Sequence, residues 1–489
     1  MKLASSLTAA LLMTALLCRG PAGALAAEDW TGLFDGKSLA GWKVAEHPEA
    51  IRVEDGVIVC DGPRAHAFYV GDVQKHDFKN FELRVTVMAN PGANSGIFFH
   101  TAPQEEGFPT KGYEVQVNNI YPGQGNNRTP VKTGSLSRVR NLYKSLVEDK
   151  QWFTLHVAVT GSRIRVSVND TLVVDYTEPA QPVRGPNQAE HVLSHGTFAL
   201  QCYDLGSKVL FKSVEVKPLP DDLAVPPLDQ SVVDRRYQEI SRLHEENFPL
   251  VDFHVHLKGG LTLEEALANS RRVGINYGIA PNCGLGFPIT DDAGIDKFLE
   301  TMKGQPVFLG MQAEGREWVK MFSKQAIQRF DYVFTDAMTF TDDRGKRIRL
   351  WIDQEVQIDN EQAFMDMCVE RILGVLNDEP IDVYVNATFL PARVAARYDE
   401  LWTDQRMDKV IDAAVKHNVA IEINATYKIP SPKFIKRAKQ AGVKFTFGTN
   451  NGGRNLGRLE YCLDMIQQCG LTSEDMFLPK RRTDAADRP

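Results

Sequence analysis

The chain has 489 residues, which is enough for two large domains or three small ones. Hydrophobic residues make up 43% and charged residues 24%, an ordinary globular composition that excludes a fibrous, collagen-like or mostly disordered protein. The formal net charge is −7. A mildly acidic chain without a basic run is not expected to bind nucleic acid or an anionic membrane surface.

The first 26 residues are predicted to be a secretory signal. A lysine at position 2 precedes an apolar run over 3–17, and the small residues Ala24 and Ala26 match a cleavage site. The run is shorter than the ~20 residues of a comfortable membrane span. We expect cleavage after residue 26, leaving a periplasmic or secreted protein with a net charge of −9, because the signal holds two basic residues and no acid. The alternatives are an uncleaved anchor and lipidation at Cys18, although Leu17 is larger than such sites prefer.

The cysteine pattern does not indicate a disulfide framework. Six of the seven cysteines lie beyond the signal, scattered over the chain and without a CxxC pair. We expect buried free thiols, with a bridge between Cys60 and Cys202 as the alternative in an oxidising compartment.

Residues 28–219 are predicted to form an all-β jelly-roll sandwich. Short alternating runs are separated by Gly, Pro and Asn, and no long helical pattern interrupts them. The expected strands are 51–53, 57–60, 81–88, 96–100, 113–118, 152–160, 163–168, 172–176, 196–201 and 209–216.

A proline-rich linker and one amphipathic helix, 231–246, occupy residues 220–247. Residues 248–478 then alternate apolar strands with helices, which predicts a parallel (β/α)7-type barrel. Seven strands is one fewer than the usual eight, so either one strand is missed or the barrel is seven-stranded. A charged tail over 479–489 is expected to be disordered. The expected barrel strands are 251–255, 277–280, 307–313, 332–335, 383–385, 420–423 and 445–447.

Every expected barrel strand ends in a polar side chain. Ligands of parallel α/β folds bind at these carboxyl ends, so the pattern predicts a ligand-binding mouth. In chain order the polar residues are His254 and His256, Asn282, Glu314, Asp336, Asn386, Asn424 and Asn450.

The two histidines are the most specific feature of this mouth. Alternate residues of a strand point to the same side, so His254 and His256 project together. Two imidazoles at this spacing can ligate one divalent metal, and Glu314 or Asp336 would complete an open site that activates water or polarises a carbonyl. The plain alternative is a pair of hydrogen-bonded histidines. We expect one divalent metal of unknown identity, or none.

The barrel half resembles the polymerase-and-histidinol-phosphatase (PHP) superfamily of metal-dependent phosphoesterases, which has a seven-stranded barrel. The resemblance is carried by residues 252–256 (DFHVH), Glu314 and residues 421–424 (IEIN). After its second, fifth and seventh strands the chain has amides where the family carries metal ligands, and a neutral amide is a weak ligand. The resemblance therefore implies one metal or none, rather than a trinuclear site.

Five segments of the β half, in this order, resemble the 3-keto-disaccharide hydrolase domain, which has a concanavalin-like jelly-roll fold. The resemblance spans residues 30–218 and implies binding of, or action on, glycosides oxidised at C3. The segments are 33–42 (LFDGKSLAGW), 94–100 (NSGIFFH), 112–118 (GYEVQVN), 133–136 (TGSL) and 211–216 (FKSVEV).

Glu114 and Gln116 alternate with apolar neighbours, so both face one side of a strand. A ketone at C3 acidifies the C2 proton, and a base that removes this proton expels the C1 substituent by elimination, after which water adds. We assign Glu114 as this base. The alternative is a hydrogen-bonded carboxylate on the sheet face. At two of the expected contacts the chain departs from the family, which carries Arg at position 100 and His near position 204. The expected sugar contacts are Asn94, His100, Gln116, Gln201 and Asp204.

The sequence thus predicts an exported carbohydrate-active hydrolase or lyase that acts on 3-keto-glycosides and carries a second, divalent-metal-dependent hydrolase-like barrel. In the first alternative, the jelly roll only holds glycan and is joined to a phosphoesterase-like or catalytically decayed barrel. In the second, the protein is a non-enzymatic glycan-binding factor. The expected partner is a small-molecule or oligosaccharide substrate, and the sequence leaves the oligomeric state open.

Overall fold

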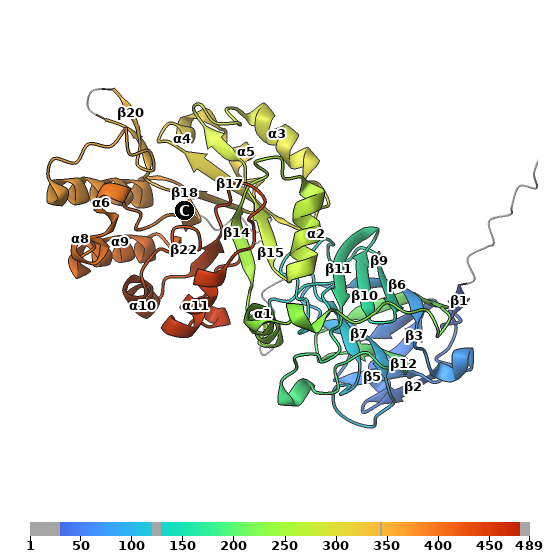
Figure 1. Cartoon of the computed structure of the whole chain (residues 1–489). Helices are drawn as coiled ribbons and strands as arrows, with labels where there is room; N and C mark the ends of the chain where they lie inside the picture. The colour runs from blue at the N-terminus through green and yellow to red at the C-terminus, as the bar shows by residue number, and fades with distance from the viewer. Residues whose placement is uncertain (1–29, 120–128, 343–344, 480–489) are drawn as a thin grey trace, which may run out of the picture.

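The computed structural model describes residues 30–119, 129–342 and 345–479, which form an all-β body and a barrel (Figure 1). The predicted signal and all but the first residue of the predicted tail lie outside the described residues. Within the described ranges, no helix is both long enough and apolar enough to span a bilayer. The described cysteines are all buried and carry free thiols.

The N-terminal body is a sandwich of two antiparallel sheets around an apolar core. One sheet has the strand order β11-β10-β9-β6-β13-β4-β3, with β1 paired to β13, and the other has the order β2-β5-β12-β7-β8. All ten predicted strands are present. The bounds are β1 Thr31–Gly32, β2 Trp42–Ala45, β3 Ile51–Glu54, β4 Val57–Cys60, β5 Ala65–Tyr69, β6 Phe81–Ala89, β7 Ser95–Thr101, β8 Tyr113–Val117, β9 Phe153–Thr160, β10 Arg163–Val168, β11 Thr171–Thr177, β12 Thr197–Cys202 and β13 Val209–Pro218.

The C-terminal body is a closed barrel of seven parallel strands. The ring runs β14-β15-β17-β18-β21-β22-β23 and returns to β14, while β16 extends from β17. The jelly roll followed by a (β/α)7-type barrel is therefore confirmed, with seven strands rather than eight. The bounds are β14 Val251–Val255, β15 Asn276–Ile279, β16 Asn282–Gly284, β17 Phe308–Glu314, β18 Tyr332–Thr335, β21 Val383–Tyr384, β22 Ala420–Asn424 and β23 Phe445–Gly448, and a hairpin of β19 Thr339–Thr341 and β20 Arg347–Arg349 follows β18.

Helices surround the barrel, and α2 shows how local sequence sets their ends. Thr262 and Glu265 form a reciprocal capping box at its start, and Gly274 ends it in the left-handed conformation with a φ of 78°. The helix bounds are α1 Arg235–Glu245, α2 Leu263–Val273, α3 Asp292–Thr301, α4 Trp318–Met321, α5 Lys324–Ile327, α6 Glu361–Asp378, α7 Ala392–Ala395, α8 Tyr398–Leu401, α9 Asp404–Lys416, α10 Pro432–Gln440 and α11 Glu460–Cys469.

The jelly roll packs against the end of the barrel at which the strands begin. Tyr143 of the jelly roll joins an apolar cluster with Phe253, Phe308 and Tyr332 of the barrel, and its hydroxyl donates to the carbonyl oxygen of Phe248 at 2.5 Å. The carboxyl ends of the strands, where the predicted mouth lies, therefore point away from the jelly roll.

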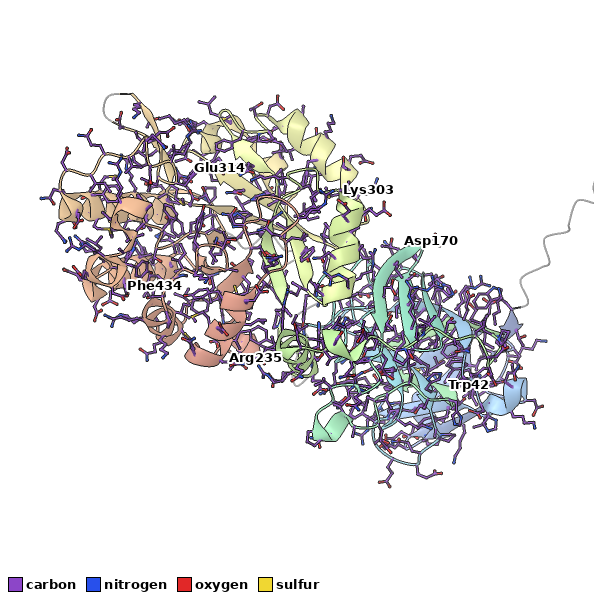
Figure 2. All side chains as sticks on the ribbon, viewed as in Figure 1. Trp42, Asp170, Arg235, Lys303, Glu314 and Phe434 are labelled. Atoms are coloured by element: carbon purple, nitrogen blue, oxygen red, sulfur yellow. The ribbon has the colours of Figure 1, made fainter. Side chains whose placement is uncertain are left out.

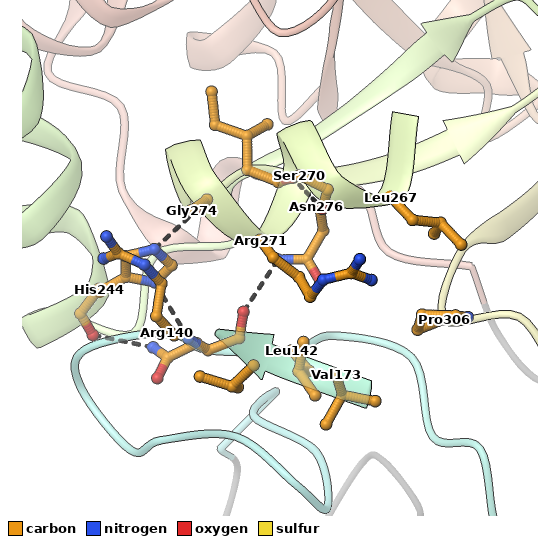
Figure 3. Close-up of a pocket in the computed structure, with 13 residues that line it drawn as sticks. Arg140, Leu142, Val173, His244, Leu267, Ser270, Arg271, Gly274, Asn276 and Pro306 are labelled. Atoms are coloured by element: carbon orange, nitrogen blue, oxygen red, sulfur yellow. Dashed lines mark hydrogen bonds between the residues drawn. The ribbon is translucent and has the colours of Figure 1, made fainter. Parts of the chain in front are cut away.

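Polar contacts around a small interdomain pocket fix this arrangement (Figure 3). Nδ2 of Asn141 donates to the carbonyl oxygen of His244 on α1 at 2.8 Å, and Nδ2 of Asn276 on β15 donates to the carbonyl oxygen of Asn141 at 2.9 Å. Lys144 forms an ion pair of 2.6 Å with Asp331, just before β18. The segment over 138–144 thus ties the β body to the barrel.

Candidate functional sites

The first candidate site lies on the outer face of the five-stranded sheet. Glu114 on β8 pairs with Phe98 on β7, and Gln116 pairs with Gly96. Their neighbour Val115 is part of the core between the two sheets. Because side chains alternate along a strand, Glu114 and Gln116 face away from that core.

The Glu114 carboxylate lies directly over Gly96. A Cβ atom at position 96 would lie 2.2 Å from Oε1 of Glu114, so the glycine leaves the room that this carboxylate occupies. Burial raises the pKa of Glu114 to about 7, against the opposing effects of a hydrogen bond with Ser137 and the charge of Arg138. A carboxyl group that titrates near neutral pH is suited to accept a proton and return it.

Two of the predicted sugar contacts lie beside each other on this face. Nε2 of Gln116 donates to Oδ1 of Asn94 at 2.5 Å. Asp204 acts through Ser207, whose hydroxyl donates to Oδ1 of Asp204 at 2.5 Å and accepts from the backbone N–H of Asn94 at 3.1 Å. Asp204 therefore helps to position Asn94 through the hydroxyl of Ser207.

Gln201 on β12 lies beside His66 on β5, a residue that the sequence analysis missed. Their Nε2 atoms are 3.4 Å apart, and burial lowers the pKa of His66 to about 4, so its ring is neutral at physiological pH. Oε1 of Gln201 is buried and has no hydrogen-bond partner among the described residues. A buried and unpaired oxygen of this kind can accept a hydrogen bond from a ligand hydroxyl.

Aromatic side chains cover part of this face. The ring of Phe108 has its centroid 5.9 Å from that of His66 and 5.6 Å from that of Tyr203, and the guanidinium of Arg64 lies 4.8 Å from its centre. Phe108 keeps 42% of its surface exposed. The site therefore combines a carboxylate, amides and apolar ring surface, which suits a saccharide.

His100 does not join this site, contrary to the prediction. It is the extra residue of a bulge between β7 and β12 and has a φ of 55°, which turns its side chain out of the strand alternation. Both ring nitrogens bond to the backbone, Nε2 at 2.9 Å from the carbonyl oxygen of Lys79 and Nδ1 at 3.2 Å from the nitrogen of Ser194. His100 is thus a buried structural residue.

The second candidate site is the barrel mouth, at the carboxyl ends of the parallel strands. Figure 2 labels one of its residues, Glu314, in the barrel body. Nδ2 of Asn282 donates to Oε1 of Glu314 at 2.7 Å, and Nδ2 of Asn386 donates to Oδ2 of Asp336 at 2.8 Å. Nδ2 of Asn424 donates to Oδ1 of Asn386 at 3.0 Å. Hydrogen bonds thus join five of the predicted polar residues into two groups, one of Asn282 with Glu314 and one of Asn424, Asn386 and Asp336.

The two predicted histidines lie side by side at this mouth, with ring centroids 5.0 Å apart. Nδ1 of His254 is 2.5 Å from Oε1 of Glu422, and its Nε2 is 3.2 Å from Oε1 of Gln312. Glu422 and Gln312 were not predicted, because both lie within strands rather than after them.

His256 differs from His254 in having one nitrogen unpaired. Its Nδ1 is 2.7 Å from the carbonyl oxygen of Ala280, whereas its Nε2 has no hydrogen-bond partner among the described residues. Burial lowers the pKa of His256 well below its ordinary value, and the nearby Asn450 side chain opposes this effect.

The mouth does not fit the expected metal. Within residues 30–119, 129–342 and 345–479, no three or more His, Cys, Asp or Glu side chains form a group that could hold a metal ion. Burial and the charge of Asp336 raise the pKa of Glu314 to about 8, and Lys258 and Arg316 already oppose this effect with positive charge. The predicted ligands His254, His256, Glu314 and Asp336 reach one mouth. His254, Glu314 and Asp336 are held by hydrogen bonds to Glu422, Asn282 and Asn386, whereas Nε2 of His256 has no partner among the described residues.

Among known proteins, the similarity is strongest in the jelly roll. Residues 29–217 match the family described as a 3-keto-alpha-glucoside-1,2-lyase-like domain. A curated 3-keto-disaccharide hydrolase from Bacteroides thetaiotaomicron is 30% identical over 125 residues, which cover 21% of this chain and 43% of that protein. The match thus spans less than half of the relative's length.

Two solved structures are similar in part. A Parabacteroides distasonis protein described as a glycosyl hydrolase is 24% identical and covers 39% of this chain and 94% of its own, with a TM-score of 0.34. Histidinol phosphate phosphatase from Lactococcus lactis is 13% identical and covers 47% of this chain and 98% of its own, with a TM-score of 0.34. From the family match, residues 29–217 form a 3-keto-disaccharide hydrolase-like domain.

Proposed function

We propose that the protein is an exported carbohydrate-active enzyme whose jelly roll cleaves 3-keto-glycosides by elimination across C1 and C2. The observation that supports this most is Glu114, a carboxyl group with a pKa of about 7 on the outer face of a sheet, in a domain that matches this family.

In the proposed reaction, ionised Glu114 takes the proton from C2, and the C–H electron pair forms an enolate with the C3 carbonyl. Arg138, whose positive charge acts on Glu114, stabilises the enolate oxygen. The enolate then re-forms the ketone, a C1–C2 double bond forms, and the C1–O bond breaks. The Glu114 proton passes to the leaving oxygen, and water adds across the new double bond. Gln116, Asn94 and Gln201 bind the sugar hydroxyls.

The direct test compares a 3-keto-glucoside with its unoxidised parent glucoside as substrates. Release of the aglycon is expected only from the oxidised substrate, because the C2 proton of the parent is not acidic. Equal release from both would indicate a two-carboxylate glycosidase mechanism instead. Binding of the oxidised substrate without release would make the jelly roll a glycan-binding module.

The pH dependence of catalysis should follow Glu114. The base must be ionised, so kcat/KM is expected to rise about tenfold per pH unit below the pKa of about 7 and to level off above it. Initial rates between pH 5 and 9 measure this profile. A profile that falls with rising pH across this range would mean that the essential form of the group is the acid.

Substitution of Gly96 tests whether the position of the carboxylate matters. In Gly96→Ala, the new Cβ would lie 2.2 Å from Oε1 and 2.8 Å from Cγ of Glu114, so the flexible side chain has to move. A displacement of about 1 Å from a reacting atom lowers kcat by about 100-fold. Gly374→Ala is the matched control, because nothing lies within 4 Å of a Cβ there. Unchanged kcat in Gly96→Ala would remove this carboxylate from the reaction.

A further inference from the structure

We propose that the barrel mouth is a second saccharide site, which binds a neutral monosaccharide through side chains without a metal ion. This site is separate from Glu114, and the proposal stands whether or not the jelly roll is catalytic.

The chemistry of the mouth suits hydroxyl groups. A sugar hydroxyl both donates and accepts a hydrogen bond, so it is best bound by groups that offer both roles. The amide of Asn282 donates to the carboxyl group of Glu314, and a second hydrogen-bonded group runs from Asn424 through Asn386 to the carboxyl group of Asp336. These two groups hold amide and carboxyl side chains in fixed positions, and such side chains can donate to and accept from the hydroxyls of a pyranose ring.

His256 supplies an independent observation at this mouth. Its side chain is 1% exposed and its Nε2 has no hydrogen-bond partner among the described residues, although its Nδ1 is held by the carbonyl oxygen of Ala280. Leaving a buried polar atom unpaired costs about 1–3 kcal/mol. The ring centroid of His254 lies 5.0 Å from that of His256, so a hydroxyl bound at Nε2 of His256 would also lie near His254.

The charges at the mouth favour an uncharged ligand. Lys258 and Arg316 face Glu314, and Nη2 of Arg316 also donates to the carbonyl oxygen of Asp336 at 2.7 Å. His254 contacts the carboxylate of Glu422. Lys258 and Arg316 thus oppose the charges of Glu314 and Asp336, so the mouth presents no concentrated charge of one sign to a phosphate group or to a divalent cation.

An aromatic residue stands beside this network. Tyr427 is 39% exposed, and its backbone N–H donates to Oδ1 of Asn424 at 2.9 Å. Burial, and to a smaller extent the charges of Asp336 and Glu422, raise the pKa of Tyr427. Its ring packs edge to face on Phe389 at 5.0 Å. An exposed ring next to amides and carboxyl groups can stack on the apolar C–H face of a sugar.

Calorimetry with D-glucose and 3-keto-D-glucose as probes, in buffer containing EDTA, tests the proposal. At least one probe is expected to bind, and Tyr427→Ala and His256→Ala should each weaken this binding about tenfold, the equivalent of one lost contact of 1.4 kcal/mol. Tyr427→Phe is the control that keeps the ring. Tyr427 is at the surface, so its variants remain informative if His256→Ala does not fold. A Gln116→Ala, Gln201→Ala double variant, which lacks two of the proposed sugar contacts of the jelly roll, should retain this binding, and this result would separate the mouth from the jelly-roll site.

Two results would overturn the proposal. The first is a stoichiometric divalent metal in the purified protein that is lost from a His254→Ala, His256→Ala double variant, as measured by elemental analysis. The second is that neither probe binds, or that both bind with the same affinity to the wild type and to Tyr427→Ala.

Discussion

Glu114→Gln is expected to lower kcat for 3-keto-glycosides by about 10³, within the range observed when a positioned general base is lost. Glutamine has the same length and can occupy the space over Gly96, but it cannot take the proton from C2. KM should change much less, because the sugar contacts of Gln116, Asn94 and Gln201 remain. Steady-state release of the aglycon at pH 8, where Glu114 is ionised, measures the effect.

The same substitution should make the protein more stable at alkaline pH. The pKa of Glu114 rises from 4.5 to about 7 on folding, so the folded state favours the protonated acid. The stability that this preference contributes is present below pH 4.5 and is lost as the pH rises through 7. Glutamine has no charge to bury, so Glu114→Gln should exceed the wild type by roughly 2–3 kcal/mol at pH 8 and by little at pH 4. Urea unfolding at the two pH values gives the comparison.

Glu105→Gln is the matched control for both measurements. Glu105 is exposed and pairs only at the surface with Lys43, at 2.6 Å, so its loss should change neither turnover nor stability appreciably. If Glu114→Gln retains more than a tenth of the wild-type turnover, another group is the base.

Tyr143→Ala is expected to cost about 3–5 kcal/mol of stability, the usual price of removing a large buried aromatic side chain. The ring fills an apolar cluster with residues of the barrel interior, and its hydroxyl bonds to Phe248 across the domain boundary. Because the lost contacts join the two bodies, thermal unfolding should separate into two transitions. Differential scanning calorimetry detects this separation.

Tyr143→Phe keeps the ring and removes only the hydroxyl, so it should cost about 1 kcal/mol and keep a single transition. If Tyr143→Ala unfolds in one transition at the wild-type temperature, the interdomain contact does not contribute to stability.

The sequence predicted the architecture well because the spacing of apolar residues differs between the two halves. The barrel strands are short apolar runs between amphipathic helices, and all seven were found at their expected places. Among the sandwich strands, β1, β2 and β5 were missed. All five residues of β5 are buried, so it lacks the polar–apolar alternation that marks a half-exposed strand, and His66 within it was missed as well.

The candidate sites were predictable only where a regular strand carries the residue. Glu114, Gln116 and His254 lie on strands and His256 directly follows β14, and simple alternation predicted their orientation. His100 lies at a bulge, which reverses the side that its side chain faces and has no signal in a single sequence. The cations near Glu314, Lys258 and Arg316, come from different loops, and their approach depends on the tertiary fold.

The direction in which the barrel faces has a kinetic consequence. The jelly roll covers the end where the strands begin, and the aromatic rings of Phe253, Phe308 and Tyr332 fill the interior behind it. Within the described residues, this packing leaves a molecule released at the sheet face to reach the mouth through bulk water around the protein. Any transfer between the two sites would then be open to competition: an isotopically labelled product would mix completely with unlabelled molecules before recapture, and an added scavenger would intercept it.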